Sequence, residues 1–494
     1  MVTAILPILA TLTLGKPFTD GAVLQRDRPV AVWGTADAGA TVAVSFAGQE
    51  KAAKADADGK WRVNLDPLAT CSEGRDLTVV EAPSSTEQSN NPNNRTILHD
   101  VLVGDVWIVC GQSNMDVPVV GTNPRYRDGQ GAAMAAITRL PLVRWNTDIG
   151  GCRWQAFTPE NLGKPGALSA VAFYFAREVH LATGVPLGLV CAYCGGTNIE
   201  EWTPKSGYAK TGLFPELLNW KRIPKEEFTT NHWHGAINHW AKQPFMAFES
   251  RLAARAPYTA LGMIWYQGEQ NAGSDRTTYD RKLAALLTGF ETEFENPALR
   301  FYMVQIPRPC SNPEFQESQA RFVKAHEADG RVKMAVVSDI ANVHEVHPAE
   351  KEPVGRRLAY LALRYDYGFK DLEAESPEPI AASVSSNRVT VAFAHAKRLT
   401  VYNARLSFDS RFELAGADGV FKPAKIVNPL VTRDWGKEQR NGELDGARVE
   451  LEADGVVAPT VVRYLHSRPY DSNVFNESGL PLGAFSLKIG SSGR

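Results

Sequence analysis

The segment Val101–Cys110 reads VLVGDVWIVC and runs directly into Gly111–Met115, which reads GQSNM. Most residues of the first part are apolar, as in a strand that is buried on both faces of a parallel sheet. The second part is a polar turn that places Ser113 just past the end of this strand. Sites in a doubly wound α/β sheet gather at the carboxyl ends of the strands. The junction therefore predicts both a fold class and the location of a site.

The residues that follow show further apolar runs, which alternate with amphipathic segments. Further apolar runs predict strands at Val185–Tyr193, Leu261–Gln267, Arg300–Ile306 and Val332–Ser338. Amphipathic spacing predicts helices at Leu168–Thr183, Tyr279–Glu295, Glu317–Asp329 and Glu352–Tyr365. Alternation of such strands with helices predicts an α/β domain over residues 101–370, with a parallel sheet covered on both faces.

The two ends of the chain differ from this middle part. Short runs rich in β-branched residues, separated by Gly, Asp and Pro, predict an N-terminal sandwich-like β domain over residues 1–100 and a C-terminal β domain over residues 371–494. A chain of 494 residues is also too long for one ordinary core. We therefore expect the order β, α/β, β.

Composition narrows the possible partners. Charged residues make up 22% of the chain, and the formal net charge is −2. This balance gives no electrostatic reason to expect binding to nucleic acid or to an anionic membrane surface. No apolar run reaches the roughly 20 residues that span a bilayer. The apolar segment Ile5–Ala10 fits either a trimmed secretion signal or a first strand.

Cysteine and histidine give no strong metal signature. Cys191 and Cys194 form a C-x-x-C pair without a second pair, so buried thiols are the better interpretation. His232, His234 and His239 follow a loose pattern without a carboxylate at matching spacing, and a packing or substrate-facing loop is favoured. We expect neither a metal nor an organic cofactor.

Two polar turns at predicted strand ends could form a nucleophile site. Ser113 could project its hydroxyl from a tight turn as a nucleophile, or it could simply N-cap a helix. Gly196 follows Gly195 at the end of the next strand, and its amide could point at a developing oxyanion or belong to an ordinary turn.

Two more turns supply amides, acids and an imidazole. After Leu261–Gln267, either Gln267 or Asn271 could donate a side-chain N–H to an oxyanion, and Glu269 could orient a base or hold the loop. After Val332–Ser338, His347 is a candidate general base. Asp339 and Glu345 are both placed in sequence to hold its imidazole in one tautomer.

Taken together, these segments resemble the sialate O-acetylesterase family, a branch of the SGNH hydrolases. The resemblance spans nearly the whole chain. It rests on the ordered set Phe18–Arg26, Asp58–Trp61, Val103–Trp107, Gly111–Met115, Gly195–Thr197 with Ile199-Glu200 and Trp202, Trp265–Glu269, Ile340–Ala359, Phe412–Gly419 and Gly479–Pro481.

The resemblance implies an SGNH-like fold and a serine esterase mechanism. Ser113 would attack an acetyl carbonyl and His347 would take its proton. The amides of Ser113 and Gly196 would bind the oxyanion together with a side-chain amide, for which Gln267 and Asn271 compete. Gln112 belongs to the same motif and is a further candidate for orienting the base or contacting substrate.

The chain departs from the family at the acid. The position three residues before the catalytic His often holds Asp in SGNH relatives, but here it is His344. The partner of His347 stays open among Asp339, Glu345 and Glu269, or a Ser–His dyad steadied by a backbone carbonyl.

The resemblance also implies a substrate and a location. The expected substrate is an O-acetylated carbohydrate, foremost O-acetylated sialic acid. The alternatives are other acetylated glycans such as xylan, or a carbohydrate-binding protein that has lost catalysis. A periplasmic or secreted location is favoured, and the oligomeric state is left open.

Overall fold

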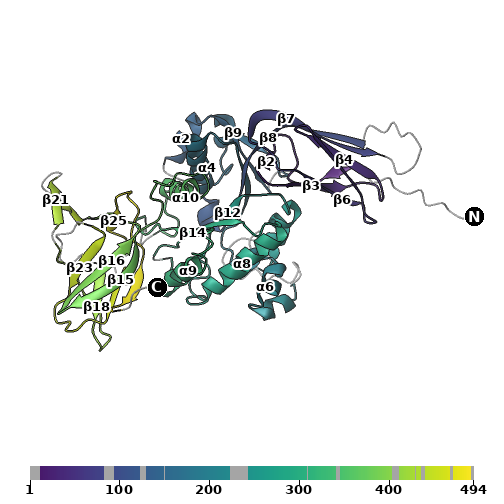
Figure 1. The fold of residues 1–494 in the computed structure, drawn as a ribbon. Helices are drawn as coiled ribbons and strands as arrows, with labels where there is room; N and C mark the ends of the chain where they lie inside the picture. The colour runs from purple at the N-terminus through teal and green to yellow at the C-terminus, as the bar shows by residue number, and fades with distance from the viewer. Residues whose placement is uncertain are drawn as a thin grey trace, which may run out of the picture.

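The fold is taken from a computed structural model. It describes residues 12–82, 94–122, 130–148, 151–222, 243–308, 310–340, 345–402, 411–428, 430–434, 440–444, 446–467 and 471–490. Along the chain, a β region is followed by an α/β region and then by a second β region (Figure 1). None of the described helices combines the length and apolar character needed to cross a membrane.

A parallel sheet forms the middle of the molecule. Its strands are β8 (Arg95–Gly111), β9 (Leu140–Thr147), β11 (Leu187–Tyr193), β12 (Gly262–Tyr266), β13 (Arg300–Val304) and β14 (Val332–Ala335). They lie in the order β9-β11-β8-β12-β13-β14, and every neighbouring pair is parallel. The antiparallel strand β10 (Gln155–Phe157) extends the sheet at β9. Because β8 is central, the chain winds outward from it in both directions, as in a doubly wound sheet.

Helices cover both sides of this sheet. Figure 1 shows α4 (Ala170–Thr183) and α10 (Glu352–Tyr365) on one side, and α8 (Tyr279–Glu293) and α9 (Pro313–Ala325) on the other. The shorter helices are α1 (Ser113–Asp116), α2 (Gly131–Ile137), α3 (Pro159–Leu162), α5 (Ile199–Trp202), α6 (Lys205–Thr211) and α7 (Met246–Arg251), with 3₁₀ turns at Pro215–Asn219 and Ala253–Arg255.

The N-terminal β region is continuous with the parallel sheet. Strands β1 (Thr13–Leu14), β3 (Val30–Thr35) and β6 (Lys60–Leu65) form a separate small sheet, whereas β2 (Val23–Gln25), β4 (Thr41–Phe46), β5 (Gln49–Lys54) and β7 (Cys71–Ala82) join the large sheet through β8. One apolar core extends from Leu12 to Ala374. The boundary proposed at residue 100 thus falls inside the long strand β8.

The described part of the C-terminal β region has its own core and three four-stranded sheets. The sheets are β15 (Glu378–Ser385), β16 (Arg388–Ala394), β23 (Arg448–Glu452) and β20 (Lys425–Ile426); β21 (Leu430–Asp434), β22 (Arg440–Leu444), β17 (Leu399–Val401) and β25 (Val474–Asn476); and β19 (Lys422–Pro423), β18 (Phe412–Ala415), β24 (Val461–Tyr464) and β26 (Phe485–Lys488). It contacts the segment after β14, where the Ser472 amide donates to the Ser338 carbonyl at 3.1 Å and the Ser338 hydroxyl donates to the Leu482 carbonyl at 3.0 Å.

Candidate active site

Three strand ends meet at one point of the parallel sheet. Gly111, the last residue of β8, pairs with Tyr193 of β11 on one side and with Tyr266 of β12 on the other. The backbone continues this junction past the strands, since the Gln112 amide donates to the Tyr266 carbonyl at 3.0 Å and the Cys194 amide to the Gly111 carbonyl at 3.1 Å. The turns that carry Ser113, Gly196 and Gln267 therefore start side by side.

Ser113 is the first residue of α1 and does not cap it. The N-cap is Gln112, and its side chain makes no capping hydrogen bond. Gly111 has to be glycine here, because a Cβ would lie 2.2 Å from the Tyr266 carbonyl oxygen. A Cβ on Gly195 would lie 3.4 Å from the Ser113 Cβ, so the Gly195 backbone lies directly beside the serine. This turn brings the Ser113 hydroxyl and the Gly195-Gly196 backbone together.

The turn after β11 is locally fixed. Gly196 has φ +70°, which favours glycine. The Thr197 hydroxyl donates to the Cys194 carbonyl at 2.8 Å, and Asn198 begins α5 in a capping box with Glu201. The Gly196 amide is thus held in a rigid turn next to Ser113.

Three side-chain amides link the first and third turns. Gln267 Nε2 lies within hydrogen-bond distance of Gln112 Oε1 (3.0 Å), the Thr197 carbonyl (3.0 Å) and Asn271 Oδ1 (2.7 Å). Gln112 Oε1 also accepts from the amides of Gly268 and Gln270. Gln112, Gln267 and Asn271 are all buried, so they act as a polar framework under the turns.

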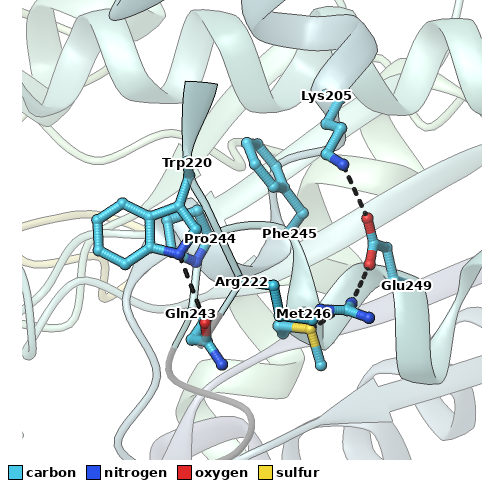
Figure 2. Close-up of a pocket in the computed structure, with 8 residues that line it drawn as sticks. All are labelled: Lys205, Trp220, Arg222, Gln243, Pro244, Phe245, Met246 and Glu249. Atoms are coloured by element: carbon cyan, nitrogen blue, oxygen red, sulfur yellow. Dashed lines mark hydrogen bonds and ion pairs between the residues drawn. The ribbon is translucent and has the colours of Figure 1, made fainter. Parts of the chain in front are cut away.

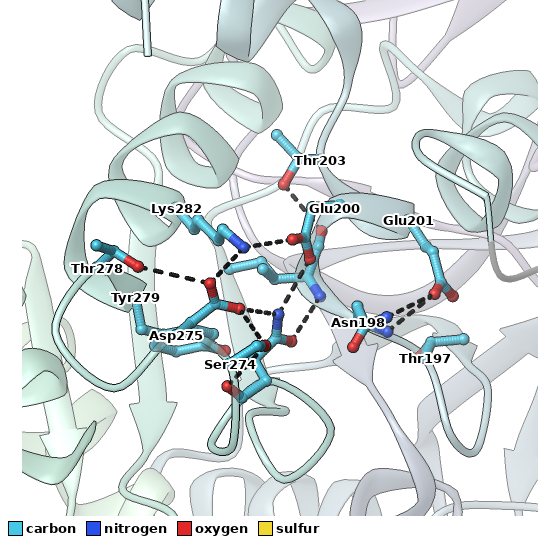
Figure 3. Close-up of polar contacts among 12 residues, drawn as sticks. Thr197, Asn198, Glu200, Glu201, Thr203, Ser274, Asp275, Thr278, Tyr279 and Lys282 are labelled. Carbon is cyan, nitrogen blue, oxygen red and sulfur yellow. Dashed lines mark hydrogen bonds and ion pairs between the residues drawn. The ribbon is translucent and has the colours of Figure 1, made fainter. Parts of the chain in front are cut away.

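A buried ionic network supports this framework (Figure 3). Lys282 of α8 bridges Glu200 of α5 and Asp275, with Nζ 2.7 Å from Asp275 Oδ1. Asn271 donates to Glu200 Oε2 at 3.0 Å and to Asp275 Oδ2 at 2.8 Å, and its Oδ1 accepts from the Ile199 amide at 3.0 Å. The network ties α5, the turn after β12 and α8 into one unit.

Asn114 joins the serine turn to the histidine loop. Its Nδ2 donates to Glu269 Oε1 at 2.5 Å and to the carbonyl of Val346 at 3.0 Å, and its Oδ1 accepts from Lys351 Nζ at 2.6 Å. Asn114 is 1% exposed and Lys351 0%. Since Asn114 directly follows Ser113 and Val346 directly precedes His347, this contact brings together two segments that lie over 200 positions apart in sequence.

The environment of His347 favours its neutral form. Burial lowers the pKa of this half-buried imidazole below its ordinary 6.5, the charge of Lys351 lowers it further, and the charge of Glu345 opposes both effects. A neutral imidazole is the form that accepts a proton as a general base.

The three candidate acids have different surroundings. Both carboxylate oxygens of Asp339 pair with Arg357, at 2.6 and 2.7 Å, so its negative charge is compensated there. Burial raises the pKa of Glu269, which accepts from Asn114. Glu345 is the acid whose charge raises the pKa of His347. Among the three, Glu345 is thus the acid with an evident electrostatic effect on the imidazole.

A separate cavity of about 260 Å³ lies beside α6 and α7 (Figure 2). Trp220 and Phe245 line it, together with Lys205 and Arg222, which both pair with Glu249 at 3.7 and 2.5 Å. None of the predicted site residues lines this cavity. The histidines at positions 232, 234 and 239 lie outside the described residues, as does His344.

Sequence reasoning gave no role to Asn114, Lys351, Lys282 or Glu200. The signal for Asn114 and Lys351 was present, since both fall inside segments that carry the family resemblance. Glu200 also falls in a segment that resembles the family, whereas Lys282 gave no signal because it lies in an amphipathic helix.

The chain is similar to known carbohydrate esterases. The family described as carbohydrate esterase, sialic acid-specific acetylesterase matches residues 103–364. Sialate O-acetylesterase of Rattus norvegicus is 29% identical over 411 residues (72% of this chain, 74% of the relative), and that of Homo sapiens is 28% identical over 396 residues (72% and 71%). A crystal structure of a carbohydrate acetylesterase from Xanthomonas citri is 30% identical, with a TM-score of 0.74, and the match covers 96% of this chain and 99% of that one.

Proposed function

The chain belongs to the sialic acid-specific acetylesterase family of carbohydrate esterases and is a carboxylic ester hydrolase, and on that basis we propose that it removes O-acetyl groups from carbohydrates as an SGNH-type serine esterase. The observation that carries the proposal is the contact of Asn114 with the Val346 carbonyl, because it holds the serine turn against the histidine loop at the carboxyl ends of the strands.

The first half of the reaction forms an acetyl-enzyme. Ser113 Oγ bonds to the acetyl carbonyl carbon while His347 takes the hydroxyl proton. The carbonyl oxygen becomes an oxyanion, facing the amides of Ser113 and Gly196. The bond from this carbon to the sugar oxygen then breaks, and His347 returns the proton to the departing alcohol. In the second half, water gives a proton to His347 while its oxygen bonds to the acetyl carbon. The bond from this carbon to Ser113 Oγ then breaks, His347 returns the proton to Oγ, and acetate leaves.

Gln267 is the better candidate for a side-chain oxyanion donor. Asn271 Nδ2 donates its two protons to the carboxylates of Glu200 and Asp275. Hydrogen bonds to a charged acceptor are stronger than those to a neutral one. Gln267 shares its two protons among three neutral acceptors. The Nε2 group of Gln267 is therefore held less strongly by its present acceptors than the Nδ2 group of Asn271.

The relatives' names suggest O-acetylated sialic acid as the substrate, with acetylated neutral glycans such as xylan as the alternative. The direct test is acetate release from O-acetylated sialic acid, acetylated xylo-oligosaccharides and an aryl acetate. We expect acetate from at least one of the sugars, and loss of that release in His347→Ala. Release from the aryl acetate alone would contradict a carbohydrate substrate.

The pH dependence of ester hydrolysis should depend on the charges of Lys351 and Glu345, which act on His347. Because activity needs the neutral imidazole, kcat/KM for an aryl acetate should fall only below pH 6.5, the ordinary pKa of this group. Lys351→Met removes a charge that lowers this pKa, so the acid limb should move up in pH. Glu345→Gln removes a charge that raises it, so the limb should move down. Both limbs moving in the same direction would contradict these electrostatics.

A further inference from the structure

Asp116 lies beside the nucleophile on the solvent-accessible side of the site. It is the last residue of α1, three positions after Ser113, and residues three apart lie on the same face of a helix. Part of its surface is exposed to solvent, whereas its carboxylate lies close enough to the surrounding protein for burial to be the main influence on its pKa. A substrate that reaches Ser113 from solvent therefore passes close to this carboxylate.

Gly195 connects Asp116 to the oxyanion turn. A Cβ added to Gly195 would lie 3.4 Å from the Ser113 Cβ. The backbone amide of Gly195 donates a hydrogen bond to the Asp116 carboxylate. Gly195 directly precedes Gly196, whose amide faces the oxyanion in the proposed reaction. Ser113, Gly195 and Asp116 thus surround the place where the acetylated sugar has to sit.

Two charged side chains, Arg251 and Asp148, act on the Asp116 carboxylate. Arg251 of α7 pairs with Asp148 at 2.6 Å, and both act on Asp116. Burial raises the pKa of the Tyr193 phenol and of the Cys194 thiol, so these neighbours stay neutral near pH 7. Among the residues that the structure describes, Arg251 is the cation that acts on Asp116, and it already has a carboxylate partner. With Asp116 ionised, this group of three charges has a net charge of −1.

We propose that Asp116 receives the acetylated sugar by accepting a hydrogen bond from one of its free hydroxyls, and that its charge selects neutral sugars against carboxylated ones. This inference rests on the proposed deacetylation at Ser113 and names its substrate class. A sialic acid carries a carboxylate that would need an available cation, whereas the hydroxyls of a xylan or a hexose can donate to Asp116.

The charge of Asp116 varies within the working pH range. Surrounding protein raises its pKa to about 7, while the charge of Arg251 and the Gly195 amide oppose that rise and Asp148 adds to it. Below pH 7 the Asp116 carboxyl is mainly protonated and neutral, so it repels an anionic sugar less than the charged form does. Above pH 7 it is charged, so the preference for neutral sugars should increase.

The experiment compares kcat/KM for acetylated xylo-oligosaccharides and O-acetylated sialic acid between pH 6 and 8.5. For the wild-type chain, we expect the neutral sugar to be favoured and the ratio to rise through pH 7. In Asp116→Asn this ratio should fall roughly 10-fold or more at pH 8 and lose its dependence on pH, because a hydrogen bond to a charged group is removed. Titration of His347 affects both substrates alike and cancels in the ratio.

Glu160→Gln is the matched control, since it removes an exposed acid of the α/β region that pairs with Arg139 at 3.3 Å and bonds to the Thr158 side chain. Its ratio should equal that of the wild-type chain. A wild-type preference for the sialic acid ester at pH 8, or an unchanged ratio in Asp116→Asn, would overturn the inference. If Asp116→Asn does not fold, the pH dependence of the kcat/KM ratio in the wild-type chain still tests the inference. Failure of the proposed function is distinguishable, because Ser113→Ala would then remain active.

Discussion

Ser113→Ala is expected to lower kcat/KM for acetyl ester hydrolysis by at least roughly 10⁴-fold, since loss of a catalytic serine leaves only the contribution of substrate binding and the oxyanion donors. The fold should be unaffected, because the N-cap of α1 is Gln112 and not Ser113. Steady-state kinetics with an aryl acetate, together with thermal unfolding of both proteins, provides the measurement.

Ser206→Ala is a suitable control. This serine also lies in a helix of the α/β region, and its hydroxyl donates to Glu293 at 2.6 Å. The control should retain wild-type activity. A Ser113→Ala protein within tenfold of wild type would require another nucleophile.

Lys282→Met is expected to reduce the free energy of unfolding by about 3–5 kcal/mol, the usual cost of removing one partner from a buried ion pair. Lys282 is 9% exposed, and its loss leaves Glu200 and Asp275 without their shared cation at 19% and 10% exposure. Urea unfolding followed by tryptophan fluorescence is suitable, because Trp202 and Trp265 are buried in the same region.

Lys324→Met provides the comparison. Its partners are Glu327 at 2.7 Å and Glu378 at 3.8 Å, and all three side chains are exposed, so its removal should cost less than about 1 kcal/mol. An equal loss for the two variants would show that the network of Figure 3 does not stabilise the turns. Activity of Lys282→Met should also fall, since Asn271 and Gln267 lose their support.

The order of strands and helices in the parallel sheet was largely predictable. Long apolar runs such as Leu187–Tyr193 identify buried strands, and α10 has the predicted bounds. Strand β9 (Leu140–Thr147) was missed, because Pro141 and Arg144 interrupt its apolar pattern. Helix α9 begins four residues before the prediction, at Pro313, where the Asn312 side chain caps it by accepting from the Phe315 amide.

The candidate site was predictable only in part. Strand ends and short motifs predicted that the turns of Ser113, Gly196, Gln267 and His347 lie together, which they do, whereas the catalytic roles of these residues stay predictions. The ion pair between Asp339 and Arg357 was not predictable, since it depends on how a loop folds back on α10. The same holds for Asp116, whose surroundings come from three separate segments.

The most direct test of the central claim is reaction with a serine-reactive phosphonate, followed by peptide mass spectrometry. We expect one adduct for each chain, on Ser113, formed rapidly in the wild-type protein, slowly in His347→Ala and not at all in Ser113→Ala. An adduct on a different residue, or full ester hydrolysis by a protein that the phosphonate leaves unlabelled, would contradict that claim.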